Sequence, residues 1–177
     1  MFIPGWLIAL ITFPGVVTHE IAHRFFCDLA KVPVYEVRYF GFGDPPAYVI
    51  HGPVKELKKA FLISIGPLII NTILCMLLTF TAALSIFVLK ETNYGFAFAL
   101  LIWIGISIGM HAFPSNADAE SFVQQVKEAK RNGFLLVISK IFAVLIKIAN
   151  ALRFIWFDAI YAFVVSMILP SLFVFVL

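Results

Sequence analysis

Long, mostly apolar runs alternate with short polar segments along the 177 residues of this chain. A helix needs about 20 mostly apolar residues to cross the roughly 30 Å hydrocarbon core of a bilayer. Four runs meet that length, and they cover about residues 2–26, 60–89, 94–113 and 154–177. The pattern predicts an all-α polytopic membrane protein with about four transmembrane helices, formed by a single domain over residues 1–177.

The first run is predicted to be a retained span rather than a cleaved signal peptide. It lacks a basic segment at its start and continues directly into the polar residues that follow Val17. Pro14 lies about one turn before His19, and a proline removes a backbone N–H from a helix. We therefore expect a kink at Pro14, close to His19.

Two polar segments are predicted to form structure of their own. Alternating apolar and polar residues on both sides of a turn-rich stretch predict a β-hairpin over about 34–51. This hairpin either accepts an extended substrate as a further strand or serves as a plain connector. Residues 134–152 form an amphipathic pattern with Lys140 and Lys147 on one face. That pattern predicts a helix at the membrane interface, or else a short additional span with snorkelling lysines.

Three residues inside the second and third runs bear on how the helices pack. Asn71 is the only amide in the second run, and it is expected either to bridge to a neighbouring helix or to hold substrate or a ligand. Gly105 and Gly109 have the spacing of small residues that lets membrane helices approach closely.

Composition supports a membrane protein and limits the other classes. Hydrophobic residues make up 62% of the chain and charged residues 13%, against about 25% charged residues in an ordinary soluble domain. The formal net charge of +3 is too small to favour nucleic acid as a partner. Cys27 and Cys75 have no paired spacing, so no disulfide framework is expected.

The most specific chemical signal is the pattern H-E-x-x-H between Thr18 and Arg24. On a helix, His19 and His23 lie on one face about one turn apart, which is the spacing of two zinc ligands. Glu20 points about 100° away from His19, so it can act as a base on water without being a ligand. A polar cluster that packs a helix bundle is the competing interpretation, but ionisable side chains inside a membrane are costly and usually functional.

A catalytic zinc site commonly takes three protein ligands and leaves a fourth position open, so a third donor is needed. Asp118 is the favoured candidate because Pro114 ends the third span and lets the backbone turn back toward the first. His111 and Glu120 are the alternatives, since both offer donors suited to zinc. Residues predicted to support the site or to contact substrate are Asn71, Asn116 and His111.

The basic residues predict how the chain sits in the membrane. By the positive-inside rule, loops rich in lysine and arginine face the cytoplasm. The first loop holds Lys31, Arg38, Lys55, Lys58 and Lys59, the third holds Lys127, Lys130 and Arg131, and the second holds Lys90 alone. The N-terminus is then outside, and the candidate ligands lie at similar depth near the cytoplasmic ends of spans one and three.

Together these residues resemble the site-2 protease type of intramembrane zinc metalloprotease, the M50 group of peptidases. The likeness rests on His19-Glu20-Ile21-Ala22-His23, on Gly66-Pro67-Leu68 with Asn71 in the next span, and on a proline-containing stretch that leads to Asp118. Ala117-Asp118-Ala119 stands where the family usually has Leu-Asp-Gly, and no PDZ-like insertion is present. The chain is therefore similar to a minimal and divergent member.

The resemblance implies zinc held by His19, His23 and Asp118, with Glu20 as general base and acid. It also implies cleavage of peptide bonds in or next to membrane-spanning segments, so membrane protein or peptide substrates and the lipid bilayer are the expected partners. Two other classes stay open: a non-proteolytic metal-binding membrane protein, such as a zinc transporter or sensor, and an inactive membrane scaffold. A transporter predicts more polar residues through the spans, and the intact Glu20 argues against an inactive scaffold. The sequence predicts neither the substrate nor the oligomeric state.

Overall fold

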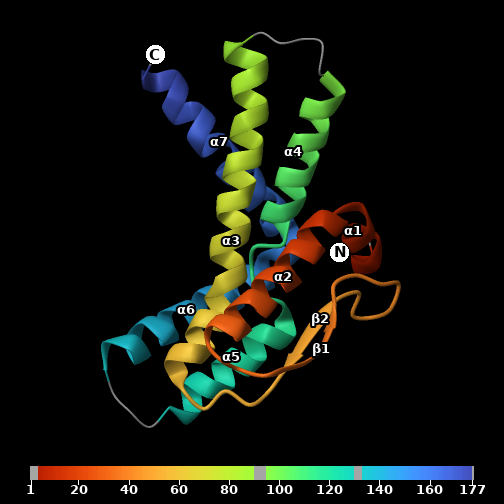
Figure 1. Cartoon of the computed structure of the whole chain (residues 1–177). Coiled ribbons are helices and arrows are strands. Elements are labelled where there is room, and N and C mark those ends of the chain that lie inside the picture. Colours follow the sequence, from red (N-terminus) through yellow and green to blue (C-terminus); the bar gives the residue numbers. More distant parts are fainter. Residues whose placement is uncertain (1–3, 90–94, 130–132, 177) are drawn as a thin grey trace.

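The computed structural model describes residues 4–89, 95–129 and 133–176, and these are mostly helical (Figure 1). The helices are α1 (Gly5–Ile11), α2 (Phe13–Leu29), α3 (Leu57–Ala83), α4 (Gly95–Met110), α5 (Asn116–Glu128), α6 (Phe134–Leu152) and α7 (Phe157–Val176). Two strands, β1 (Val34–Arg38) and β2 (Tyr48–His51), come between α2 and α3. A π-helical turn, Leu84–Val88, continues α3, and a 3₁₀ turn, Arg153–Ile155, joins α6 to α7.

The described residues contain two or three helices that are long and apolar enough to cross a membrane, where four spans were predicted. Among the described residues, Leu57–Ile86 and Phe134–Ile155 meet that requirement, and α1 with α2 adds a third if the bent pair is one broken span. The 16 residues of α4 extend about 24 Å, below the roughly 30 Å of a hydrocarbon core. The prediction of four spans is therefore not confirmed. The described residues leave out Lys90, Lys130 and Arg131, which entered the prediction of orientation.

The first predicted span is not one kinked helix but two helices at an angle of 89°. The break falls at Thr12, two residues before the expected kink at Pro14, which lies in the first turn of α2. Pro14 has no backbone N–H to donate to Leu10, so the helix arriving from α1 cannot continue through it. Thr12 holds the corner, because its hydroxyl donates to the Ile8 carbonyl at 2.6 Å and lies 2.7 Å from His111 Nε2.

The last predicted span also begins later than expected, at Phe157. Trp156 has a φ of 62°, in the left-handed region, which ends the 3₁₀ turn and redirects the chain into α7. Arg153 and Asp158 lie on either side of this turn, and Arg153 Nε donates to Asp158 Oδ2 at 2.9 Å. Apolar residues continue through the turn, so the pattern alone placed the start too early.

The hairpin is confirmed, with β1 and β2 antiparallel and Arg38 opposite Tyr48. The amphipathic helix has the expected bounds as α6, which buries Phe142 and Ile146 in the core shared with α5. Its Lys140 and Lys147 are exposed, and so are the apolar residues on the outer face of the helix: Val137, Ile141, Val144, Leu145 and Ile148. Whether α6 lies on the membrane or spans it stays a prediction, since it also has the length and composition of a span.

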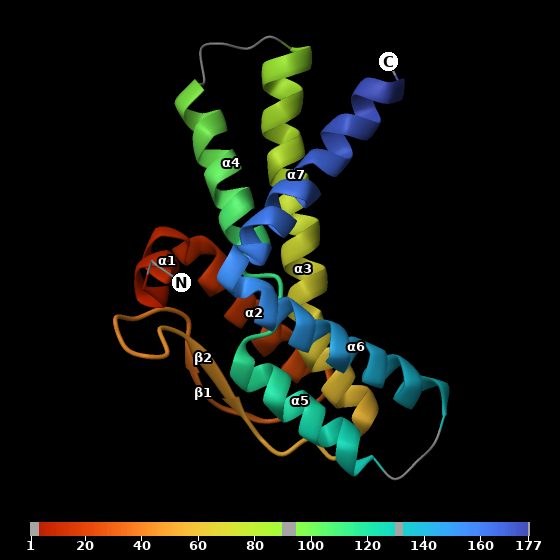
Figure 2. The ribbon, with the colours of Figure 1, turned by 180° about the vertical axis from the view of Figure 1, so that it is seen from behind.

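Helix α3 is the central element of the fold (Figures 1 and 2). One half of α3 packs with α4 and α7, while α2, α5 and α6 surround the other half and the hairpin lies beside α2. A Cβ at Gly105 would lie 2.7 Å from Thr79, and one at Gly109 would lie 2.8 Å from Cys75. The predicted close approach of helices at these two glycines is therefore confirmed.

Candidate metal centre

Three predicted ligands meet where α2 passes the N-terminal end of α5. His19 and His23 lie on one face of α2, and Asp118 lies in the first turn of α5. Asp118 Oδ2 is 3.3 Å from His23 Nε2 and 3.8 Å from His19 Nε2. One ligand atom from each residue lies within 4.8 Å of the others, and no other three His, Cys, Asp or Glu residues in the described part of the chain are grouped in this way.

The imidazole nitrogens that face Asp118 are suited to bind a cation. His19 and His23 are only 6% and 5% exposed, and neither Nε2 has a hydrogen-bond partner among the described residues. A buried polar atom without a partner costs about 1–3 kcal/mol, so two such atoms beside one carboxylate oxygen fit an ion bound between them. Two imidazoles and a carboxylate are donors that zinc takes, and three protein ligands leave one position open. The donor set therefore fits zinc.

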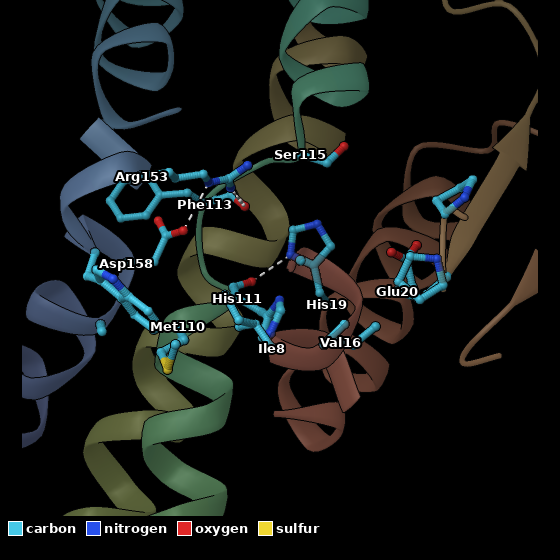
Figure 3. A pocket seen from close by; sticks show the side chains of 17 residues that line it. Ile8, Val16, His19, Glu20, Met110, His111, Phe113, Ser115, Arg153 and Asp158 are labelled. Carbon is cyan, nitrogen blue, oxygen red and sulfur yellow. Dashed lines mark hydrogen bonds and ion pairs between the residues drawn. The ribbon is translucent and has the colours of Figure 1, made fainter. Parts of the chain in front are cut away.

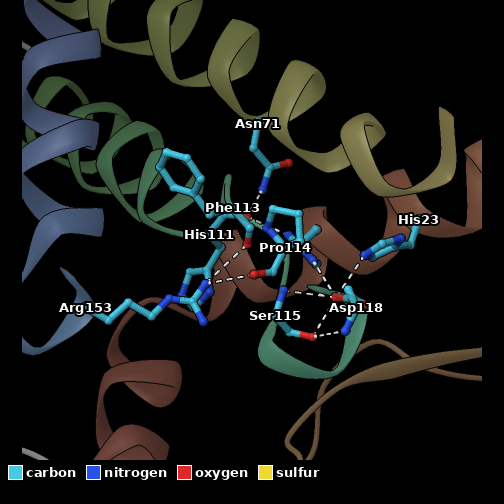
Figure 4. Close-up of polar contacts among 9 residues, drawn as sticks. His23, Asn71, His111, Phe113, Pro114, Ser115, Asp118 and Arg153 are labelled. Atoms are coloured by element: carbon cyan, nitrogen blue, oxygen red, sulfur yellow. Dashed lines mark hydrogen bonds and ion pairs between the residues drawn. The ribbon is translucent and has the colours of Figure 1, made fainter. Parts of the chain in front are cut away.

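The backbone carbonyl of His111 sets the orientation of His19. His19 Nδ1 lies 2.6 Å from this oxygen, and because a carbonyl can only accept, Nδ1 must carry the hydrogen. In the neutral imidazole, the form that binds a metal, the lone pair is then on Nε2, the atom that faces Asp118. Asn71, which is fully buried, donates from Nδ2 to the same oxygen at 2.8 Å (Figure 4). Asn71 thus bridges α3 to the end of α4, in agreement with the first of its two interpretations.

A capping box holds Asp118 in place (Figure 4). Ser115 Oγ accepts from the Asp118 backbone N–H at 3.2 Å, and Asp118 Oδ2 accepts from Ser115 N at 3.0 Å and from Ser115 Oγ at 2.6 Å. Burial raises the pKa of the Asp118 carboxyl, but the adjacent His23 and His19 lower it by more, so its pKa lies well below the usual range. Asp118 is therefore ionised at neutral pH and offers a negative charge to a cation.

Two glycines let α2 approach its neighbours closely. A Cβ at Gly15 would lie 1.9 Å from the carbonyl oxygen of Ser107 in α4, and one at Gly66 would lie 2.1 Å from the ring of Phe26. A larger side chain at either position would force the backbone or the ring to move. Helix α2 is thus fixed between α3 and α4, and Gly66 in the Gly66-Pro67-Leu68 motif has a packing role.

Glu20 follows His19 on α2 but is not among the three grouped ligands. It is partly buried, and with His19 it lines a cavity of about 320 Å³ (Figure 3). Arg153 and Asp158 lie at the side of this cavity formed by the start of α7. The apolar walls include Ile8, Val16, Met110, Phe113 and Trp156. A carboxylate in this position can exchange a proton with a molecule held in the cavity.

The other candidate residues do not join the ligand group. The His111 side chain lies against Thr12, with Nε2 2.7 Å from Oγ1, and only its backbone carbonyl contacts a ligand. Glu120 is exposed on α5 and outside the group of three, and Asn116 is exposed at the first position of α5. The geometry therefore favours Asp118 over both alternatives as the third ligand.

Sequence reasoning missed two residues that support the site. Ser115 and Asp118 have the S-x-x-D spacing of a capping box, a signal that could have identified Ser115. Arg153 donates from Nη2 to the carbonyls of Phe113 and Pro114, at 3.4 and 3.2 Å. Local patterns do not relate residues so far apart in the chain, so Arg153 had no comparable signal.

Comparison with known proteins adds no assignment. The chain matches no family model, no curated protein and no solved structure. The functional argument therefore rests on the sequence motifs and on the geometry of the site.

Proposed function

We propose that the protein is a zinc-dependent endopeptidase of the membrane, which hydrolyses peptide bonds in or next to membrane-spanning segments of protein substrates. The observation that carries this proposal is the grouping of His19, His23 and Asp118 beside a cavity that Glu20 lines. The H-E-x-x-H pattern and the resemblance to site-2 proteases support the same function. The long apolar helices that pack around the site agree with a substrate in the membrane.

Each residue has a defined task in the reaction. His19, His23 and Asp118 would hold a zinc ion, and the carboxylate of Asp118 would offset part of its charge. The chemistry supplied by zinc when bound would be polarisation of the scissile carbonyl and a lowered pKa, about 7, for a bound water molecule. Glu20 takes a proton from the attacking water as its oxygen bonds to the carbonyl carbon, and passes that proton to the leaving amine as the C–N bond breaks.

The cavity beside Glu20 suits a substrate side chain next to the scissile bond. Its volume of about 320 Å³ falls within the range of roughly 300–1,000 Å³ typical of ligand sites. A substrate helix must unwind locally, because its backbone hydrogen bonds otherwise shield the carbonyls. Pro45 to Ala47 of the hairpin loop border the cavity, and in the described residues β1 and β2 pair only with each other. Their outer edges are open to an unwound peptide.

The proposal includes a cytoplasmic site and an N-terminus on the opposite side of the membrane. The segment from the end of α2 to the first turn of α3 carries five basic residues, which the positive-inside rule assigns to the cytoplasm. The start of α3 lies beside α5, the helix that carries Asp118 (Figure 1). Water then reaches the metal centre from the cytoplasmic side.

The test compares the purified wild type with Glu20→Gln. Glutamine keeps the shape of the side chain but cannot take a proton, so this variant should retain zinc and lose cleavage. Glu120→Gln changes an exposed carboxylate on α5 and is the matched control, which should cleave like the wild type. Mass spectrometry of membrane-protein fragments from cells that carry each form identifies the cleavages that depend on Glu20.

The outcomes separate the three functional classes. Cleavage by Glu20→Gln would contradict the role of Glu20 as base. Bound zinc without any cleavage that depends on Glu20 would favour a metal transporter or sensor. Absence of zinc from the wild type would favour an inactive scaffold.

A further inference from the structure

Arg153 connects three elements near the metal centre. It follows α6 and begins the 3₁₀ turn, and the left-handed Trp156 then brings Asp158 of α7 back beside it. Arg153 Nε donates to Asp158 Oδ2 at 2.9 Å. Its Nη2 donates to the carbonyls of Pro114 and Phe113, at 3.2 and 3.4 Å (Figures 3 and 4). The Arg153 and Asp158 side chains are only 28% and 19% exposed, so solvent screens these contacts weakly.

The two carbonyls that Arg153 holds come directly before Ser115, the N-cap of α5. Pro114 is buried and has no N–H, so its carbonyl is its only backbone group for hydrogen bonding. Because Ser115 binds Asp118 through the capping box, a displacement of Pro114 would displace the third ligand. At the other end of the same segment, the carbonyl of His111 is held from α2 and α3. Hydrogen bonds thus hold the segment from His111 to Pro114 at both ends, and the charged donor among them is Arg153.

We propose that Arg153 is a positioning residue of the metal centre, which holds the backbone of Phe113 and Pro114 so that Asp118 meets the two histidines. The inference rests on the zinc centre of the proposed function. A guanidinium suits this task because its planar fork directs Nε and Nη2 to different acceptors at the same time, whereas the single ammonium of lysine cannot. The carboxylate of Asp158 fixes the orientation of the fork.

The test is the zinc affinity of the purified full-length chain, measured without substrate by competition with a chelating dye. Arg153→Lys keeps the charge and removes the fork, and loss of a group that supports a ligand typically weakens metal binding about 10- to 100-fold. Arg24→Lys is the matched control, because Arg24 Nε also donates to a carboxylate oxygen, of Asp28, at 2.9 Å. Within the described residues Arg24 holds no loop carbonyl, so its variant should bind zinc like the wild type.

A double-mutant cycle shows whether Arg153 acts through Asp118. Asp118→Ala leaves two histidines to bind zinc weakly, and adding Arg153→Lys to it should cause no further loss. If Arg153→Lys lowers the zinc affinity by the same factor with and without Asp118, the proposal is overturned. Such a result would point to a general loss of structure, which does not depend on Asp118. Unchanged affinity in Arg153→Lys alone would also overturn it.

Asp158→Asn gives a second route to the same answer if Arg153→Lys does not fold. This variant leaves Arg153 in place and gives it an uncharged acceptor. The loss of zinc affinity should therefore be smaller than in Arg153→Lys, and it should again occur only when Asp118 is present. An equal loss in the Asp118→Ala background would overturn the proposal. Failure of the wild type to bind zinc would instead overturn the metal centre itself, and the positioning role with it.

Discussion

Ser115 and Asp118 bind each other reciprocally in the first turn of α5, and the Asp118 oxygen that takes part in this cap also lies 3.3 Å from His23 Nε2. One carboxylate oxygen therefore serves both the helix terminus and the ligand group. The position of the third ligand is set by a helix cap, so changes in the cap should change metal binding.

Ser115→Ala should weaken both α5 and the metal centre. Loss of an N-cap hydroxyl typically costs about 0.5–2 kcal/mol of stability, and loss of a group that supports a ligand lowers metal affinity about 10- to 100-fold. Thermal unfolding of the metal-free protein and a zinc titration measure the two effects. Ser85→Ala is the control, because the Ser85 hydroxyl donates to Thr81 far from α5. Equal zinc affinities in both variants would contradict the role of the cap.

Asn71→Leu should destabilise the fold and weaken zinc binding. The side chain is similar in size, but it leaves the His111 carbonyl without one of its two donors, and a lost buried hydrogen bond costs about 1–3 kcal/mol. Thermal unfolding with and without zinc gives both quantities. Thr81→Val is the control, since its hydroxyl donates to Leu77 on its own helix. A loss of stability with unchanged zinc affinity would show that Asn71 only joins α3 to α4.

Loss of the Asp118 charge should weaken zinc binding across the neutral range. The pKa of Asp118 lies well below its usual range, so the carboxylate stays ionised between about pH 5 and 8. Asp118→Asn removes this charge and keeps the shape of the side chain, so the variant should bind zinc more weakly than the wild type at every pH in this interval. Zinc titrations at several pH values measure both affinities. Equal affinities of the two forms would contradict the role of Asp118 as a charged ligand.

Gly15→Ala should disrupt the contact between α2 and α4. The new Cβ would lie 1.9 Å from the backbone oxygen of Ser107, and overpacking of this kind typically costs about 1–3 kcal/mol or more. The movement of α2 also carries His19 away from Asp118, so the melting temperature and the zinc affinity should fall together. Gly95→Ala is the control, because nothing lies within 4 Å of a Cβ there. If Gly15→Ala and Gly95→Ala had the same melting temperature and zinc affinity, the close contact between α2 and α4 would not hold His19 in place.

The candidate ligands on α2 could be predicted from the sequence because their relation is local. Four positions make about one helical turn, so the spacing of His19 and His23 predicts a shared face wherever the helix lies. The prediction of Asp118 as third ligand needed a second argument, from topology. The choice between Asp118, His111 and Glu120 depended on the turn of the chain after Pro114. The cap at Ser115 was also readable from its spacing to Asp118. No local pattern relates Arg153 to the carbonyls of Phe113 and Pro114, which it contacts across about 40 residues of sequence.

The bounds of the apolar helices could not be predicted in the same way. Hydrophobicity continues through Thr12 and Trp156, yet the chain turns at both. Thr12 is held by a contact with His111, a residue distant in the sequence, and Trp156 adopts a left-handed conformation that apolar patterning does not encode. Apolar composition also does not give the length of a helix, so the run that contains α4 resembled a full span although α4 has only 16 residues.

The most direct test of the central claim is the zinc content of the purified wild type, Glu20→Gln and His23→Ala, measured by inductively coupled plasma mass spectrometry. The account predicts stoichiometric zinc in the wild type and in Glu20→Gln, because Glu20 lies outside the ligand group. It predicts a large loss in His23→Ala, which removes a ligand. A wild type without stoichiometric zinc, or a His23→Ala variant that keeps it, would contradict the account.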